Sequence, residues 1–509
     1  MEHQDKKQWK SRRVDKAMTS RDKITSPTEK AVSSKSTKKK VSACPFSRNC
    51  GGCTMIDLPM EEQLQRKYTR MQECIGVFGP VEPVIRMKNP YRYRNKVTSI
   101  FGLDRKGHPV CGVYKAGTRE IVSVKDCLIE NRRADAIVKD IYRLLPSFKL
   151  RVYDPATGFG VLRAVQIRTA HATGEILVTL VTAGPVFPSR SNLVKTLRQL
   201  HPEITSIVQN IKDNDSSLVL GNREKVLYGE GYIEDELCGK RFRISSRSFY
   251  QVNSLQTEKL YHIALDAAGL TGKERVLDAY CGIGTIGICA ADRAKEVLSV
   301  ELNEDAARDA EENVRRNRLK NVRVYHEDAG QFMEEMAGRG ERAEVLLMDP
   351  PRSGSSERFL QAALQMKPNR IVYISCNPET LGRDLKPLTE GGYQMKKAVP
   401  VDMFPFTPEI ETVCLLVRRN GLHIDIDVDV EEMLQKKRGQ ATYAQIKDYV
   451  LEQTGLKVSS LYISQVKRKC GLDVSDSYNK PKSEDAIVPQ CPPEKEEAIM
   501  NALRHFGVI

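Results

Sequence analysis

The chain has 509 residues, of which 40% are apolar. At roughly 150 residues per domain this length corresponds to about three domains with packed cores, which excludes wholesale disorder and a small disulfide scaffold. The 80 Lys and Arg outnumber the 66 Asp and Glu, and the resulting net charge of +14 favours polyanionic partners such as nucleic acid.

Residues 1–43 carry much of this positive charge. They contain 13 Lys and Arg but 5 Asp and Glu, with few large apolar side chains, so we predict a disordered basic arm. No apolar run reaches the ~18 residues of a membrane-spanning helix, and we expect a cytoplasmic monomer. Cysteines stay reduced in that compartment, so clustered members of the 13 are expected to be metal ligands or nucleophiles.

Residues 44–240 are predicted to form a mainly β domain that begins with a cysteine cluster. The periodic, mixed-charge stretch at 58–74 predicts an exposed helix. From 91 to 232 the sequence changes to short alternating runs, such as 96–101 and 161–167, separated by turns rich in Gly and Asp. This pattern is typical of β-strands.

Residues 241–419 alternate between predicted strands and helices. The predicted strands are 276–280, 297–301, 322–325, 345–349, 371–375 and 412–417. This alternation predicts an α/β domain with a largely parallel sheet covered on both faces. Ligands of such sheets bind at the carboxyl ends of the strands.

The tail over residues 420–509 is predicted to be a small helical extension. Thr442 can cap a helix with Ile446 and Val450 on one face, and a second helix carries the basic run Lys467-Arg-Lys469. Two interpretations stay open. The pair of helices either docks on nucleic acid through the basic run or packs as a plain appendage.

The sequence Gly282-Ile-Gly-Thr-Ile-Gly287 lies between a predicted strand and a predicted helix, where glycines let the backbone approach a cofactor closely. Glu301, at the end of the next strand, is placed to bind the ribose hydroxyls of an adenosine. Asp278, at the mouth of the first strand, would repel the pyrophosphate of NAD but suits the positive charge of S-adenosylmethionine.

Two further strand ends carry polar residues, in Asp349-Pro-Pro-Arg352 and Ser375-Cys-Asn-Pro378. Cys376 is followed by a predicted helix, whose N-terminal partial charge is expected to lower the thiol pKa and favour a thiolate nucleophile. The alternative is a small buried residue. Glu411, directly before the last strand, is either a base or a solvated loop acid.

Three cysteines, Cys44, Cys50 and Cys53, are spaced so that their thiolates can converge on one metal centre. A fourth ligand must come from elsewhere, and spacing does not choose among Cys74, Cys111 and the cysteine at 127. Zinc and an iron–sulfur cluster both accept four thiolates, so the metal also stays open.

Taken together and in this order, the motifs from about Cys44 to Arg418 resemble the RNA uracil-5-methyltransferase family, and most closely its 23S rRNA branch. The resemblance implies a Rossmann-like, S-adenosylmethionine-dependent methyltransferase domain and an RNA substrate, with 23S rRNA expected and tRNA as the alternative. It also implies a [4Fe–4S] cluster bound by Cys44, Cys50, Cys53 and Cys127.

The resemblance further assigns roles in the reaction. It implies cofactor contacts from Gln251, Tyr280, Glu301 and Asp349. Cys376 matches the nucleophile that adds to uracil C6, and Glu411 matches the proton acceptor at C5. The target uridine would be flipped out of the folded RNA to reach them.

The chain departs from the family pattern in three places. Glu409 stands where members often have His, no β-barrel precedes the cysteines, and the tail extends beyond the usual end. Rival interpretations are a dehydrogenase, a metal-dependent RNA-binding protein without catalysis, and a methyltransferase acting on cytosine or an exocyclic amine. Arg352 argues against an amine substrate, because an aromatic residue usually follows Asp-Pro-Pro in such enzymes.

Overall fold

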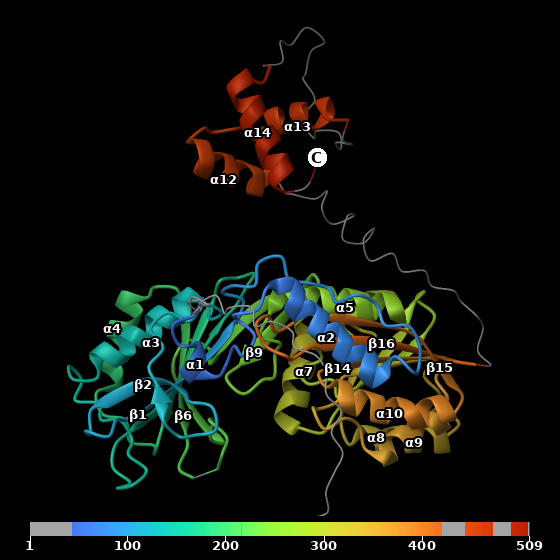
Figure 1. Ribbon diagram of the computed structural model, residues 1–509, viewed down its shortest axis with the longest axis horizontal. Helices are drawn as coiled ribbons and strands as arrows, with labels where there is room; N and C mark the ends of the chain where they lie inside the picture. The colour runs from blue at the N-terminus through green and yellow to red at the C-terminus, as the bar shows by residue number, and fades with distance from the viewer. Residues whose placement is uncertain (1–42, 215, 420–442, 472–489, 507, 509) are drawn as a thin grey trace, which may run out of the picture. The chain divides into compact units, whose positions relative to one another are not determined.

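The structure is a computed structural model that describes residues 43–214, 216–419, 443–471, 490–506 and 508 (Figure 1). The predicted basic arm, apart from residue 43, and the predicted helix cap Thr442 lie outside the described residues. Within the part of the chain that is described, no helix is both long enough and apolar enough to cross a membrane.

Residues 275–418 contain one seven-stranded sheet. Its strands are β10 (Arg275–Ala279), β11 (Glu296–Glu301), β12 (Val322–His326), β13 (Val345–Met348), β14 (Arg370–Ser375), β15 (Tyr393–Val401) and β16 (Glu411–Arg418). Their order is β12-β11-β10-β13-β14-β16-β15; the first five are parallel, and β16 is antiparallel to both β14 and β15. All six predicted strands are confirmed, and β15 is an additional edge strand.

Helices cover both faces of this sheet, as predicted. They are α5 (Ser254–Ala268), α6 (Thr285–Ala290), the short 3₁₀ helix η1 (Ala291–Arg293), α7 (Glu304–Arg316), α8 (Ala329–Gly338), α9 (Glu357–Met366) and α10 (Pro378–Glu390). Figure 1 shows α5 on one side and α8, α9 and α10 on the other. Successive strand residues point to opposite faces, so Val276 packs in the core with α5 and α6 while Leu277 packs in the core with α8, α9 and α10.

A helix far upstream in the sequence completes the second of these cores. After the short helix α1 (Ser47–Cys50), α2 (Met60–Ile75) packs Met71 and Ile75, both fully buried, against α10. A Cβ at Gly382 of α10 would lie 2.6 Å from the Cys74 carbonyl oxygen, so only glycine permits this close approach. The helix at 58–74 is therefore confirmed, but its prediction as exposed is wrong because one face is core.

The central region contains a second seven-stranded sheet, in the order β3-β2-β1-β4-β5-β6-β7. The strands are β1 (Lys96–Leu103), β2 (Pro109–Tyr114), β3 (Ile121–Val122), β4 (Leu162–Thr169), β5 (Ile176–Thr182), β6 (Ile204–Ile211) and β7 (Arg223–Tyr228). Helices α3 (Arg132–Leu144) and α4 (Arg190–Leu200) share its core. The sheet is mostly antiparallel, as expected of a mainly β region, but α3 and α4 were not predicted, and α4 links the parallel pair β5 and β6.

A separate hairpin, β8 (Tyr232–Leu237) and β9 (Lys240–Ser245), follows the central sheet and packs with the core of α5 and α6. The predicted domain boundary at residue 240 falls in this hairpin. Three helices are described within the tail: α12 (Tyr443–Thr454), α13 (Ser460–Lys469) and α14 (Pro493–His505). They share a small apolar core that includes Ile446, Ile463 and Leu503, and α14 was not predicted.

Replacing Met71 with alanine tests whether α2 belongs to the core of the methyltransferase-like sheet. We expect Met71→Ala to lower the free energy of unfolding by about 2–5 kcal/mol, because the side chain is fully buried. Chemical denaturation measures the change, and Gln65→Ala on the exposed face of α2 is the control. An unchanged free energy of unfolding in Met71→Ala would contradict the assignment.

Candidate active site

Three ionisable side chains meet at one edge of the sheet of β10–β16. Asp349 follows β13, Cys376 follows β14, and Glu411 is the first residue of β16. The antiparallel register pairs Ser375 with Thr412, so its next step places Cys376 opposite Glu411. The charges of Glu411 and Asp349 both raise the pKa of the Cys376 thiol, as expected of neighbouring groups.

The Cys376 thiol is half-buried beside the N-terminus of α10, which Asn377 caps. Its pKa is raised to about 11, first by burial and then by the charges of Glu411 and Asp349, with Arg352 acting in the opposite direction. The prediction of a lowered thiol pKa is therefore wrong. Burial and two adjacent acids outweigh the partial charge of the helix end.

Glu411 is 4% exposed. Burial raises its pKa well above the usual range, and the charges of Asp349 and Glu409 add to the effect. Its Oε2 atom is buried and makes no hydrogen bond with the described residues. Such a carboxyl group has an oxygen available for a substrate proton. Burial also raises the pKa of Asp349, to about 7.

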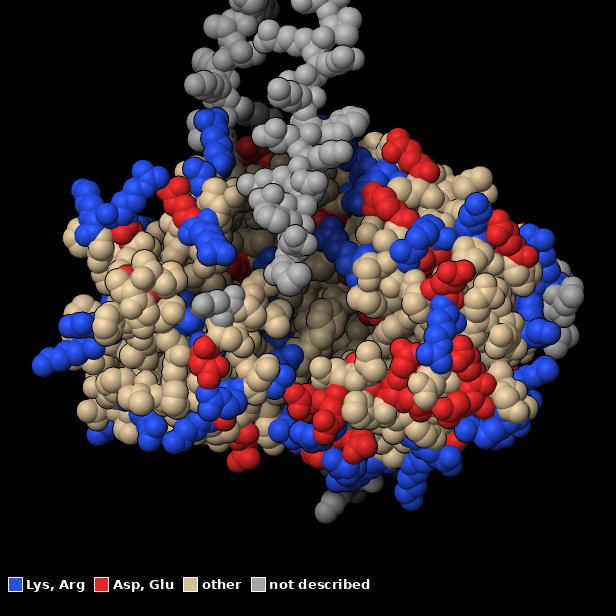
Figure 2. Space-filling view, turned by 90° about the horizontal axis from the view of Figure 1, so that it is seen from below, with Lys and Arg blue, Asp and Glu red and all other residues tan. Residues whose placement is uncertain are grey.

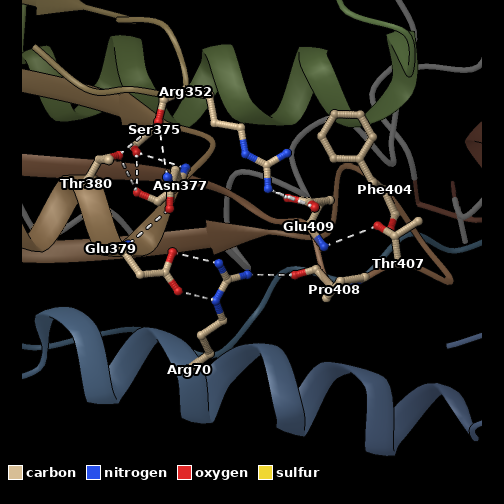
Figure 3. A network of polar contacts seen from close by, with 10 residues as sticks. All are labelled: Arg70, Arg352, Ser375, Asn377, Glu379, Thr380, Phe404, Thr407, Pro408 and Glu409. Atoms are coloured by element: carbon tan, nitrogen blue, oxygen red, sulfur yellow. Dashed lines mark hydrogen bonds and ion pairs between the residues drawn. The ribbon is translucent and has the colours of Figure 1, made fainter. Parts of the chain in front are cut away.

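An ion pair closes the outer side of this edge (Figure 3). Arg352 Nη2 lies 3.0 and 2.9 Å from the two carboxylate oxygens of Glu409. The Arg352 carbonyl oxygen accepts hydrogen bonds from Asn377 Nδ2 at 3.1 Å and from Thr380 Oγ1 at 3.3 Å. The loop after β13 is thereby fixed to the start of α10.

Helix α2 supports the segment that leads into Glu411. Lys67 Nζ donates to Asp402 Oδ1 at 2.5 Å and to the Phe404 carbonyl at 3.1 Å, and the ion pair is almost fully buried. Arg70 binds both carboxylate oxygens of Glu379 at 2.8 and 2.7 Å and the Pro408 carbonyl at 3.2 Å (Figure 3). Two basic side chains therefore anchor residues 402–408 to α2.

The glycine loop folds around two acidic residues. Glu301 accepts hydrogen bonds from the backbone N–H groups of Gly282 and Asn303, both at 2.8 Å. Asp278 is 1% exposed and accepts the N–H of Gly287 at 2.9 Å. The prediction that Asp278 faces the cofactor's positive charge is wrong, since its carboxyl group is buried under α6 and stabilises the loop.

Tyr280 and Gln251 complete the predicted cofactor set. Tyr280 has a left-handed backbone (φ 61°), and its half-buried ring lies 4.9 Å, between centroids, from that of Phe359. Gln251 is buried ahead of α5, where its carbonyl accepts Asn95 Nδ2 at 2.9 Å. Tyr280, Glu301 and Asp349 thus follow or end three adjacent strands at one sheet edge.

The four predicted cluster cysteines are all half-buried. The charges of Cys50 and Cys44 help burial to raise the pKa of Cys53 to about 11, and Cys44, Cys53 and Cys127 pack against one small apolar cluster. The thiols are therefore neighbours. Across the described residues, however, no three His, Cys, Asp or Glu side chains are arranged as a metal site, and the cluster stays a prediction.

Comparison with known proteins identifies the family. The model of the tRNA (uracil-5-)-methyltransferase family matches residues 194–419. An uncharacterized RNA methyltransferase of Halalkalibacterium halodurans is 41% identical over 382 residues, which is 74% of this chain and 83% of the relative. One of Listeria monocytogenes is 43% identical over 378 residues, or 73% and 83%. The chain belongs to the tRNA (uracil-5-)-methyltransferase family.

A solved structure agrees with this membership. The tRNA (uracil-54, C5)-methyltransferase of Pyrococcus abyssi, in complex with S-adenosyl-L-homocysteine, superimposes with a TM-score of 0.60 at 27% identity, covering 72% of this chain and 86% of that one. The chain is an S-adenosylmethionine-dependent RNA methyltransferase. The dehydrogenase interpretation and the non-catalytic one are both wrong.

Sequence reasoning missed how this methyltransferase braces its site. The Arg352–Glu409 pair spans 57 residues and Arg70–Glu379 spans 309, so neither partner is visible from local pattern. The available signal was charge alone, because opposite charges occur in segments predicted to reach the same sheet edge. The role of α2 was hidden by its mixed charge.

The thiol pKa of Cys376 gives a direct test of the site's electrostatics. Glu411→Gln should lower this pKa because it removes a negative neighbour, and Arg352→Gln should raise it because it removes a positive one. The pH dependence of alkylation of the Cys376 peptide, followed by mass spectrometry, measures the shifts. Cys111, whose pKa of about 11 comes from burial, is the internal control. Alkylation of Cys376 with a midpoint below pH 8 would contradict the assignment.

Proposed function

We propose that this methyltransferase transfers a methyl group to C5 of a uridine in structured RNA, with Cys376 as nucleophile and Glu411 as proton acceptor. One observation carries the proposal: a half-buried thiol stands opposite a buried carboxyl group that has an unused oxygen. Uracil C5 is a poor nucleophile, so a thiol and a separate base are both required.

Tyr280, Glu301 and Asp349 at the strand edge, with Gln251 ahead of α5, would hold the cofactor in this proposal. Glu301 would bind the ribose hydroxyls, and Tyr280 would contact the adenosine. When bound, S-adenosylmethionine supplies the methyl group and a sulfonium charge that favours the ionised forms of nearby acids. Asp349, whose pKa burial raises to about 7, is one acid that such a charge would ionise.

The protein's residues handle two protons. Cys376, which is half-buried, loses its proton to solvent before its sulfur forms a bond to C6 of uracil, and the displaced electron pair makes C5 electron-rich. After methyl transfer to C5, the Glu411 carboxylate removes the proton from C5, and the C–S bond breaks to release the thiolate. Because burial raises the pKa of both groups, activity should increase with pH from neutral upward. Arg352 favours the thiolate.

Loss of the nucleophile tests this mechanism. Cys376→Ala should lower methyl transfer about 10⁴-fold or more and abolish covalent trapping by 5-fluorouridine RNA, because no C–S bond can form. The affinity for S-adenosylhomocysteine, measured by calorimetry, should not change. Cys111→Ala, which removes a thiol of similar pKa in β2, is the matched control.

The same assay separates Glu411 from its neighbour. Glu411→Gln should accumulate the covalent enzyme–RNA adduct with unmodified uridine, since the C5 proton then has no acceptor, whereas Glu409→Gln should turn over. The opposite result, an adduct in Glu409→Gln alone, would transfer the base role to Glu409.

We propose 23S rRNA as the target, on the resemblance to the ribosomal branch, with tRNA as the second candidate. The solved Pyrococcus abyssi relative is named for tRNA, and this specific observation favours tRNA. Figure 2 shows Lys and Arg side chains spread over one face among Asp and Glu, and the net charge of +14 favours the phosphate backbone of either kind. Both RNA classes place the enzyme in the cytoplasm.

A direct assay distinguishes the two targets. Unmodified 23S rRNA and tRNA transcripts are incubated with the enzyme and labelled S-adenosylmethionine, and 5-methyluridine is located by mass spectrometry. We expect one uridine in 23S rRNA to be methylated and tRNA to stay unmodified. Methylation of tRNA alone would reverse the assignment, and Cys376→Ala enzyme is the blank for both.

We further propose that Cys44, Cys50, Cys53 and Cys127 bind a [4Fe–4S] cluster. The support is the mutual influence of the first three thiols and the apolar cluster shared with Cys127. Protein purified without oxygen should contain about four iron and four sulfide per chain. Cys50→Ser should lose them, while Cys74→Ser, outside the set, should keep them. Zinc in place of iron would contradict the proposal.

A further inference from the structure

A second thiol cluster lies outside the methylation site. Cys238 occupies the turn between β8 and β9, and Cys289 lies near the end of α6. The Cys238 sulfur is 3.5 Å from His262 Nδ1 on α5, and it interacts with the Cys289 side chain. The Cys289 thiol donates a hydrogen bond to the carbonyl oxygen of Leu237, the residue before Cys238, at 3.7 Å. Three elements thus bring two thiols and an imidazole into contact.

The side chains next to Cys238 favour its ionised form. His262 Nδ1 lies 2.6 Å from the Glu258 carbonyl oxygen, which only accepts, so this nitrogen carries the hydrogen and donates it to that oxygen; the Cys238 sulfur lies 3.5 Å from the same nitrogen. The interaction with Cys289 and then, against burial, the one with His262 lower the pKa of Cys238 to about 6. The Glu258 charge raises the pKa of Cys238, and the Lys240 charge lowers the pKa of Cys289.

The backbone at Cys238 gives an independent indication. Cys238 and Gly239 are both left-handed, with φ of 52° and 73°, as in a two-residue turn that normally holds Asn-Gly or Asp-Gly. A cysteine is strained in this conformation, and strained residues cluster where side chains have a chemical role. Cys238 is half-buried, whereas Cys289 is 7% exposed.

We propose that Cys238 and Cys289 are an oxidation-sensitive dithiol, in which a peroxide oxidises Cys238 and Cys289 then closes a disulfide. The Cys238 thiolate attacks one peroxide oxygen; an S–O bond forms, the O–O bond breaks, and the leaving hydroxide takes up a proton to give water. The Cys289 sulfur then attacks the Cys238 sulfur. An S–S bond forms, the S–O bond breaks, and the departing hydroxide leaves as water with the Cys289 proton. One peroxide is reduced to two waters for each disulfide.

The reactivity of the reduced protein is the first test and needs no variant. In a short iodoacetamide pulse at pH 7, Cys238 should be alkylated about tenfold or more faster than Cys74, because Cys238 is largely thiolate and burial raises the pKa of Cys74. Peptide mass spectrometry of the full-length protein measures both rates. Equal rates at the two cysteines would overturn the proposal.

The product of oxidation is the second test. Stoichiometric hydrogen peroxide should yield a cross-linked peptide pair containing Cys238 and Cys289, reversible by dithiothreitol. In Cys289→Ser the reaction should stop at a sulfenic acid on Cys238 that dimedone traps, and Cys74→Ser should behave like the unaltered chain. A disulfide that pairs Cys238 with another cysteine, or oxidation that spares Cys238, would overturn the proposal.

Discussion

The antiparallel pairing of β14 with β16 holds a thiol and a carboxyl group face to face, and the rest of the site depends on it. The five parallel strands end at one edge, so the first residue of a further strand joins that edge only if the strand runs the other way. Glu411 meets this condition as the first residue of β16. This arrangement buries several acidic groups close together, and burial raises the pKa of Cys376, Asp349 and Glu411.

The strands of this domain were predictable because helices cover both faces and leave near-continuous apolar runs. The edge strand β15 was missed because Lys396, Lys397 and Pro400 interrupt its pattern, and proline is tolerated only at such an edge. In the central region the alternating strands dominated the interpretation. The helical spacing of Ala134, Ile137, Val138 and Ile141 in α3 was present but overlooked.

The chemistry of the site was predictable in kind, but its energetics were not. Motif order was enough to bring Asp349, Cys376 and Glu411 to one strand edge. The ionisation of the thiol depends instead on its three-dimensional surroundings. The helix N-terminus alone predicts a lowered pKa, whereas burial and two acids on neighbouring strands raise it. Asp278 illustrates the same limit, because the glycine loop turns its carboxyl group inward to Gly287 and away from a ligand.

The buried ion pair between Lys67 and Asp402 joins residues 335 positions apart. Lys67 is synthesised long before Asp402. At a synthesis rate of about 5–20 residues per second, the interval between them is roughly 15–70 seconds. Until then the apolar face of α2 and the charge of Lys67 have no native place to pack. The nascent chain therefore cannot assemble a working active site before residue 411 has been made, and shorter nascent chains cannot act on RNA.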